Sequence, residues 1–133
     1  MTKTDKNIIV TACFLTALTI GFGAFGAHGL EKIVSKEAIQ TFETGVRYQM
    51  YHALALFVIG LSGFIPKKIK KTVTTLFLLG IFLFSFSIYF LALTEVLPFS
   101  VKYLGPITPI GGLLLIIGWI YLGLKLLTFK RDN

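Results

Sequence analysis

The sequence is poor in charge and in cysteine. Only 14% of its 133 residues are charged, whereas soluble domains carry roughly 25%, so a fold surrounded by water is not expected. The lone cysteine, Cys13, lies inside an apolar stretch and can form no disulfide within one chain, which excludes a disulfide-stabilised fold. The length suits one domain, because domains run to roughly 100–200 residues. We therefore predict a single domain, residues 1–133, whose solvent is lipid.

Long apolar stretches are the main feature of the chain. Four of them contain no Asp, Glu, Lys or Arg: Ile8 to Leu30, Tyr48 to Pro66, Thr72 to Thr94 and Tyr103 to Leu124. About 20 helical residues cross ~30 Å of hydrocarbon, and each stretch is close to that length. Backbone groups in lipid must bond to one another, which a helix achieves within itself. The sequence predicts an all-α integral membrane bundle of four transmembrane helices.

The positive charges predict the orientation of this bundle, because cytoplasmic loops are enriched in Lys and Arg. The side that holds both termini and the middle loop has nine: Lys3, Lys6, Lys67, Lys68, Lys70, Lys71, Lys125, Lys130 and Arg131. The other side has four: Lys32, Lys36, Arg47 and Lys102. We therefore expect both termini to lie inside the cell. Because the net charge of +7 is spread along membrane edges, nucleic acid is not expected as a partner.

The segment from Glu31 to Arg47 predicts an amphipathic helix. Ser35 can cap its start, and apolar side chains recur at helical spacing at Ile39, Phe42, Val46 and Met50. The opposite stripe is polar: Lys36, Gln40, Glu43 and Arg47. We interpret it as a helix lying at the outer interface that continues, through a bend at Gly45, into the second crossing. The second outer connection, rich in proline, is predicted to be an irregular loop.

Small residues predict where helices pack closely. Ala12, Thr16, Thr19, Gly23 and Ala27 line one face of the first helix, and such faces let helix backbones approach in lipid. Gly111 and Gly112 are expected to do the same in the fourth helix. The glycines from Gly21 to Gly26 match a dinucleotide-binding pattern by letter, but they lie within a span and follow no strand, so nucleotide binding is not expected.

Polar residues in the spans gather in one leaflet and form the candidate site. They are His28, Glu43, Arg47, Gln49, His52, Ser85, Ser87 and Thr108. Ionisable groups are costly in a bilayer, so those that are retained are candidates for function. The structural alternative is that they join helices by hydrogen bonds. Two histidines with no Cys or carboxylate at ligand spacing do not indicate a metal site, and no cofactor is expected.

Four segments carry a resemblance to a known family. They are Gly23 to Leu30 (GAFGAHGL), Val46 to Leu56 (VRYQMYHALAL), Phe84 to Tyr89 (FSFSIY) and Leu104 to Gly112 (LGPITPIGG). In these segments the chain resembles the small bacterial membrane proteins of domain-of-unknown-function family 423, which are similar to eukaryotic transmembrane protein 256. Phe86 departs from the family pattern, which has glycine there. The resemblance implies a multi-pass protein of the plasma membrane and implies no activity.

Three functions follow from these features. The favoured one is a structural or accessory membrane protein whose polar residues bridge helices or engage a membrane-protein partner. The second is a small transporter or channel, which needs a homo-oligomer because four helices enclose little space. The third is a lipid-binding protein or intramembrane enzyme that uses His28 or His52 as acid or base with Arg47 holding an anionic group. No paired carboxylates or Ser-His-Asp pattern indicates a reaction, so we do not predict an enzyme.

Overall fold

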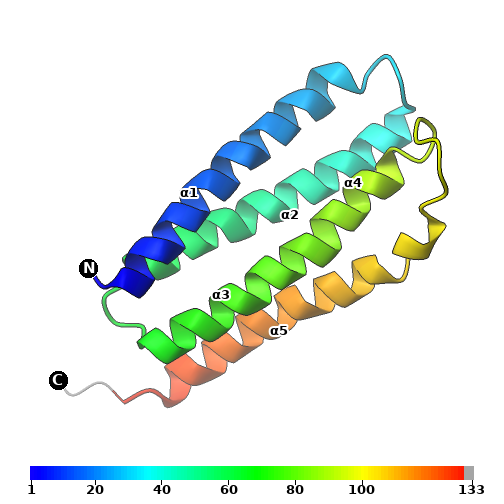
Figure 1. Cartoon of the computed structure of the whole chain (residues 1–133). Helices are drawn as coiled ribbons and strands as arrows, with labels where there is room; N and C mark the ends of the chain where they lie inside the picture. Colours follow the sequence, from blue (N-terminus) through cyan, green and yellow to red (C-terminus); the bar gives the residue numbers. More distant parts are fainter. Residues whose placement is uncertain (131–133) are drawn as a thin grey trace.

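The computed structural model describes residues 1–130, and its helices lie side by side as antiparallel rods (Figure 1). Their bounds are α1 (Lys3–Ala24), η1 (Phe25–Gly29), α2 (Lys36–Leu61), α3 (Lys67–Ile81), η2 (Phe82–Phe86), α4 (Ser87–Ala92), η3 (Lys102–Leu104) and α5 (Ile107–Thr128). Here η1 and η2 are π-helical turns that continue α1 and connect α3 to α4, and η3 is a 3-10 turn. Arg131, one of the nine positive charges counted above, lies outside the described residues.

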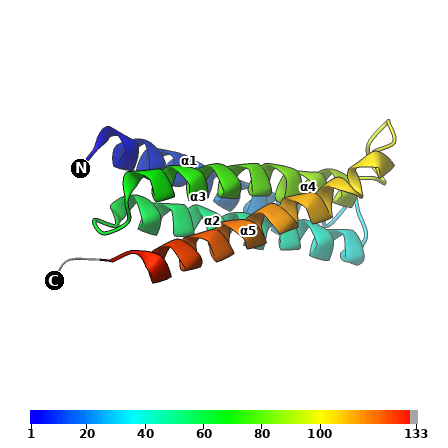
Figure 2. The ribbon, with the colours of Figure 1, turned by 90° about the horizontal axis from the view of Figure 1, so that it is seen from below.

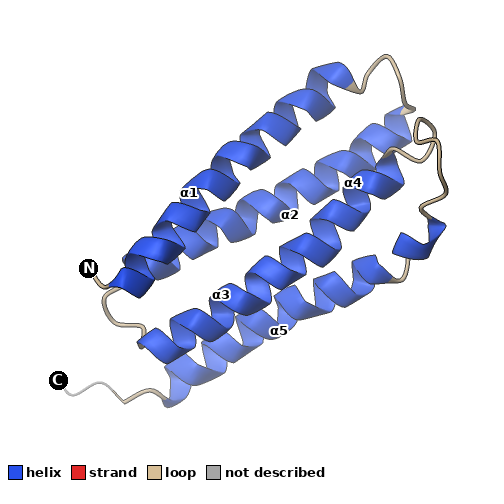
Figure 3. Cartoon of the chain, viewed as in Figure 1, coloured by secondary structure: helices blue, strands red, loops and turns tan. Residues whose placement is uncertain are grey.

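The two ends of the bundle differ in what they hold. The start of α1, the end of α5 and the α2–α3 connection lie at one end, which we call the termini end, in both Figure 1 and Figure 2. The connections after η1 and after α4 lie at the opposite end. Figure 3 shows only helices and loops over the described residues, as the sequence predicts for an all-α protein.

Local signals at the helix starts agree with the sequence. Thr2 caps α1, accepting from the Asp5 backbone N–H at 3.1 Å while the Asp5 carboxylate accepts from the Thr2 N–H at 3.3 Å. This reciprocal pair is a capping box, which satisfies donors that the first turn leaves free. Ser35 caps α2 by accepting from the Ala38 N–H at 3.2 Å, as predicted.

Three helical segments are long and apolar enough to cross a membrane. They are Lys3–Gly29, Lys67–Ala92 and Lys102–Thr128. These three agree with the first, third and fourth predicted crossings, although the α-helix of the last begins at Ile107 rather than Tyr103. Within residues 1–130, α2 is the long helix that is not among them, and its first half carries Lys36, Glu37, Glu43 and Arg47.

The amphipathic segment and the second apolar stretch form one continuous helix of 26 residues, as predicted, and it is not interrupted at Gly45. Tyr89 covers Gly45, so this glycine makes room for a neighbouring ring. The helix also ends at Leu61, earlier than the predicted Pro66, because Ser62 turns into extended backbone.

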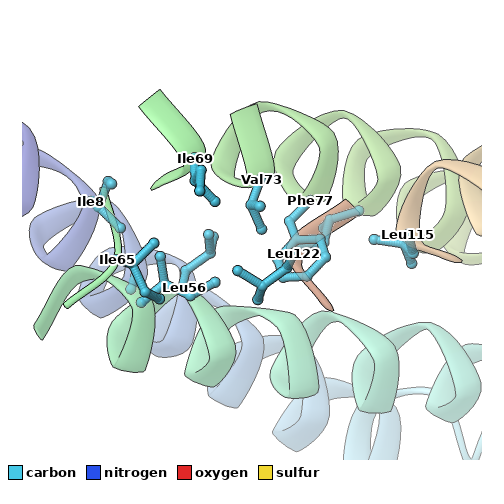
Figure 4. Close-up of a cluster of buried hydrophobic side chains, with 11 residues drawn as sticks. Ile8, Leu56, Ile65, Ile69, Val73, Phe77, Leu115 and Leu122 are labelled. Carbon is cyan, nitrogen blue, oxygen red and sulfur yellow. The ribbon is translucent and has the colours of Figure 1, made fainter. Parts of the chain in front are cut away.

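Two apolar cores lie along the bundle. The larger, drawn in Figure 4, joins side chains from α1, α2, α3, α5 and the α2–α3 connection: Ile8, Ala12, Leu56, Ile59, Ile65, Ile69, Val73, Phe77, Ile81, Leu115 and Leu122. The smaller, toward the opposite end, joins Leu30, Phe42, Tyr89 and Ala92. In lipid such contacts stabilise helix association through close packing rather than through removal of apolar area from water.

Close packing is tightest between α3 and α5. A methyl group added at Gly80 would lie 2.5 Å from Leu115 Cδ2, and one at Gly118 would lie 2.6 Å from a Phe77 ring carbon. One at Gly111 would overlap the backbone of Phe84. The two helices therefore alternate large and small residues, each filling the space beside a glycine of its neighbour, and this contact fixes η2 against the first turns of α5.

Candidate functional site

His52 lies inside the bundle with both ring nitrogens engaged. Its side chain is 5% exposed. Nδ1 lies 2.6 Å from the Tyr48 carbonyl oxygen, and Nε2 accepts the Trp119 indole N–H at 3.0 Å. Since Nε2 accepts, it is unprotonated, and the ring proton sits on Nδ1 and is donated to Tyr48. The geometry therefore fixes one neutral tautomer that ties α2 to α5.

The rings around His52 form a small aromatic cluster. The centroid of Phe77 lies 4.9 Å from that of His52 and 5.0 Å from that of Trp119. Trp119 lies twelve residues into α5 and is half-exposed, with its N–H turned toward His52. A buried indole N–H needs an acceptor, and His52 supplies it.

Gln49 and Tyr89 form a second polar contact, between α2 and α4. Gln49 is fully buried, and its Oε1 accepts from the Tyr89 hydroxyl at 2.6 Å. One turn earlier, the Ser85 hydroxyl donates to the Gly45 carbonyl at 2.7 Å. The Nε2 amide nitrogen of Gln49 is buried without a hydrogen-bond partner among the described residues. These bonds join α2 first to η2 and then, one turn along, to α4, which continues η2.

Ser87 and Thr108 form a third contact, at the π-helical turn η2. The Ser87 hydroxyl lies 2.5 Å from the Leu83 carbonyl and 2.9 Å from that of Phe84, and 2.6 Å from Thr108 Oγ1. A π-turn displaces carbonyls from the regular α-helical ladder, and Ser87 supplies a donor to them. Either hydroxyl can donate in the bond between Ser87 and Thr108, which joins α4 to α5.

The other members of the predicted cluster are placed differently. His28, Glu43 and Arg47 are exposed, and no side-chain hydrogen bond or ion pair involves them within the described part of the chain. The structure thus separates the polar residues into two groups. Gln49, His52, Ser85, Ser87 and Thr108 bridge helices inside the bundle, whereas His28, Glu43 and Arg47 lie on its surface near the opposite end.

The small residues that were predicted to lie at helix contacts also fall into two groups, those that do and those that do not. Gly111 faces the Phe84 backbone, and added methyl groups at Gly112 and Gly23 would be in ordinary contact, 3.4 Å from Phe84 Cδ2 and Val46 Cγ1. Ala27 is exposed, while its neighbour Gly26 is the buried residue, with Phe42 where a methyl group would be. Gly26 continues the small face at ordinary helical spacing, since it follows Gly23 by three, so the face meets α2 at Gly26 rather than at Ala27.

An ion pair between α1 and α3 was not foreseen from the sequence. Lys70 is 3% exposed, and its Nζ donates to Asp5 Oδ1 at 2.6 Å and to the Gly60 carbonyl oxygen at 3.4 Å. It therefore links the starts of α1 and α3 and the end of α2. The helical spacing of Lys70, Val73 and Phe77 was the available signal, because it puts the lysine on the buried face of α3.

The chemistry of this arrangement is that of helix bridging. The Ser85, Ser87 and Tyr89 hydroxyls and the His52 ring are each bonded to a partner on their own helix or on a neighbouring one. Among the described residues, the buried Ser62 and Thr74 hydroxyls have no such partner. No group of three or more His, Cys, Asp or Glu residues that could hold a metal occurs within residues 1–130.

Comparison with known proteins identifies relatives along nearly the whole chain. The family described as "Protein of unknown function (DUF423)" matches residues 22–112. The UPF0382 membrane protein SH2409 of Staphylococcus haemolyticus (strain JCSC1435) is 44% identical, over 94% of this chain and 97% of its own. The UPF0382 membrane protein YwdK of Bacillus subtilis (strain 168) is 43% identical, over 86% and 91%. A UPF0382 membrane protein of Haemophilus influenzae is 38% identical, over 88% and 91%. No solved structure matches.

Proposed function

We propose, from the premise that this chain belongs to the DUF423 family of multi-pass membrane proteins, that it is a structural or accessory protein forming one four-helix domain. All four helices cross the plasma membrane, with both termini in the cytoplasm. Its inward polar side chains hold the bundle in one arrangement, and its outer surface meets lipid and a partner, either another membrane protein or a second copy of the chain.

The state of His52 carries the structural part of this proposal. A catalytic acid or base needs a proton or lone pair that is free to reach a substrate. Both ring nitrogens of His52 are occupied, by Tyr48 and Trp119. His28 and Arg47, the other members of the enzymatic hypothesis, lie on the surface, apart from the network around His52. These contacts favour helix bridging over acid–base chemistry.

The length and packing of α2 support a fourth crossing. Its 26 residues extend ~39 Å at ~1.5 Å per residue, enough for the hydrocarbon layer and part of an interface. It packs against α1 from Phe42, which covers Gly26, to Gly60, which contacts Ile8 and Ile9. A helix that follows a membrane-spanning neighbour along its length crosses with it. Its polar Gln49 and His52 face the other helices, and the exposed Glu43 and Arg47 lie in its first half, toward the opposite end.

Single-cysteine labelling tests the threading. In a Cys13→Ala background, we expect a membrane-impermeant maleimide to label Lys36→Cys and Lys102→Cys on intact cells, and Lys68→Cys and Lys125→Cys only after permeabilisation. All four positions are exposed in the structure. Labelling of Lys36→Cys and Lys68→Cys from the same face would contradict the fourth crossing, and with it the shared placement of the termini and the middle loop.

Crosslinking in native membranes tests the accessory role. The exposed face of α5 carries Ile116 and Ile120, 57% and 56% exposed. A photoreactive residue at either position should crosslink to a defined membrane protein or to a second copy. Crosslinks to lipid alone at both positions, and at Phe14 and Ile20 on α1, would count against a partner. A discrete oligomer whose subunits surround Arg47 would instead favour the transporter hypothesis.

A further inference from the structure

A hollow of about 480 Å³ opens at the termini end, between the starts of α1 and α3. Figures 1 and 2 both place these two helix starts at this end of the bundle. Lys3 and Asn7 of α1 and Lys67, Lys71 and Thr74 of α3 are among the residues that line it. Three ammonium groups therefore surround one concave site, which is unusual on a chain with so little charge.

The positive charge of this hollow is not balanced locally. Asp5 is the acidic residue nearest to it in sequence, and its carboxylate is already paired with the buried Lys70. The other acidic residues among those the structure describes are Glu31, Glu37, Glu43 and Glu95, which lie toward the opposite end. The positive ends of the α1 and α3 dipoles add to the field. Pro66 begins α3 without a side-chain cap, so that end is not neutralised by a carboxylate.

A buried hydroxyl in the same hollow gives an independent sign of a ligand. Thr74 Oγ1 is buried and has no hydrogen-bond partner within the described residues. Its neighbours behave otherwise: the hydroxyls of Thr72 and Thr75 donate to the carbonyls of Lys68 and Lys71, each at 3.1 Å or less. An unpaired buried polar group is destabilising, so the Thr74 hydroxyl fits a site that an acceptor completes.

We infer that this hollow binds the phosphate of an anionic lipid headgroup. Lysines bind phosphate through charge, and a threonine hydroxyl can donate to its oxygens. Basic pockets between membrane helices on the cytoplasmic side are suited to phospholipid headgroups, and the hollow faces the bilayer rim if the termini end lies at the cytoplasmic surface. The inference takes only this placement from the proposed function. A lipid source is favoured over a soluble phosphate because most of the surface that lines the hollow is apolar, which suits a headgroup with acyl chains attached.

The test is a lipid titration of the full-length, delipidated protein in a non-ionic detergent, followed by native mass spectrometry. The probes are phosphatidylglycerol and phosphatidylcholine. We expect phosphatidylglycerol to be retained preferentially. The variant with Lys3→Gln and Lys71→Gln should bind it roughly 30-fold more weakly, since each lysine that faces the phosphate within the hollow should contribute roughly a fivefold factor.

Two matched controls distinguish specific binding in the hollow from general attraction by surface lysines. The variant with Lys6→Gln and Lys68→Gln removes the same charge from the same two helices outside the hollow, and should bind within about twofold of the original protein. Thr74→Val removes only the unpaired hydroxyl and should weaken binding about fivefold, whereas Thr72→Val should not. Thermal unfolding of each variant shows that the fold is kept.

Three results would overturn the inference. Equal loss in the two double-lysine variants would mean that the attraction is diffuse. Equal retention of phosphatidylglycerol and phosphatidylcholine would mean that phosphate charge is not recognised. Displacement of the lipid by millimolar inorganic phosphate, with phosphate bound in its absence, would assign the site to a soluble anion. The cysteine labelling described above reports on threading independently, so a failure there is distinguishable from a failure here.

Discussion

At the residue scale, His52 shows how a membrane bundle accommodates an ionisable group. Its ring donates to Tyr48, accepts from Trp119 and packs edge-on against Phe77. Hydrogen bonds between membrane helices contribute modestly, roughly 0.6–1.7 kcal/mol each. Loss of the ring would also leave a cavity, and the cavity adds to the loss of stability.

The two histidines are therefore predicted to differ. His52→Ala should lower the free energy of unfolding by about 2–4 kcal/mol, through the cavity and the unpaired Trp119 N–H. His28→Ala, at an exposed position, should change it by less than about 0.5 kcal/mol. Unfolding in mixed micelles, followed by far-ultraviolet circular dichroism, measures both. A stable His52→Ala protein that loses a cellular phenotype would instead indicate a functional histidine.

Lys70 shows the limit of counting charges. By sequence it belongs to a basic run with Lys67, Lys68 and Lys71 and contributes to orientation. In the structure those three are exposed, while Lys70 is buried against Asp5 and Gly60. The loop that holds a lysine decides how it is counted in predicting orientation. Whether the lysine forms an ion pair depends instead on which face of its helix it occupies.

At the element scale, the contact between α3 and α5 depends on glycine. Gly80, Gly111 and Gly118 leave space for Leu115, the Phe84 backbone and Phe77 respectively. The Phe84 backbone belongs to the π-turn η2, whose hydroxyl bridge from Ser87 to Thr108 lies beside it. The close contact at Gly111, the π-turn η2 and the Ser87–Thr108 hydrogen bond therefore lie together at one place in the bundle.

Two glycines of α5 provide a test of this arrangement. Gly111→Ala should destabilise the protein by about 1–3 kcal/mol, because the methyl group meets backbone that cannot rotate away. Gly123→Ala, where an added methyl group meets nothing within 4 Å, should be neutral or stabilise by up to about 1 kcal/mol. Thermal unfolding in detergent distinguishes them. Equal effects at both positions would mean that helix propensity, not packing, sets the response.

At the scale of the whole molecule, α2 depends on the other helices for its place. It is the least apolar of the four rods, and two of its buried polar side chains, Gln49 and His52, bond to Tyr89 of α4 and Trp119 of α5. In hydrocarbon such groups are destabilising unless they are paired. Because these partners come later in the chain than α2 itself, we predict that α2 inserts completely only when α4 and α5 are present.

A truncated chain tests this dependence. In a fragment of residues 1–66, we expect α2 to insert incompletely, so that Lys36→Cys is labelled from both sides of the membrane in a mixed population. The full chain should give one side. Replacing Gln49 and His52 by leucine in the fragment should restore insertion, since it removes the two polar groups. A uniformly oriented fragment without these substitutions would show that α2 inserts by its own hydropathy.

Prediction from the sequence succeeded where composition alone decides the outcome. Charge-free runs of about 20 residues can be stable in lipid only as helices, and this rule located the three apolar helices. Ser35, a typical capping residue, correctly predicted the start of α2. It failed where a feature depends on helix rotation: the close contact with α2 is at Gly26 rather than at the predicted Ala27.

The sequence by itself determined that the chain is helical, belongs in a membrane and has its positive charge gathered on one side. Those properties follow from local composition, which acts within each segment. Only the tertiary structure decided which polar residues meet. It buried Gln49 and His52, left His28 and Arg47 at the surface, and paired Asp5 with Lys70 across 65 positions. Such contacts depend on the rotation and register of packed helices, which a single helix does not encode.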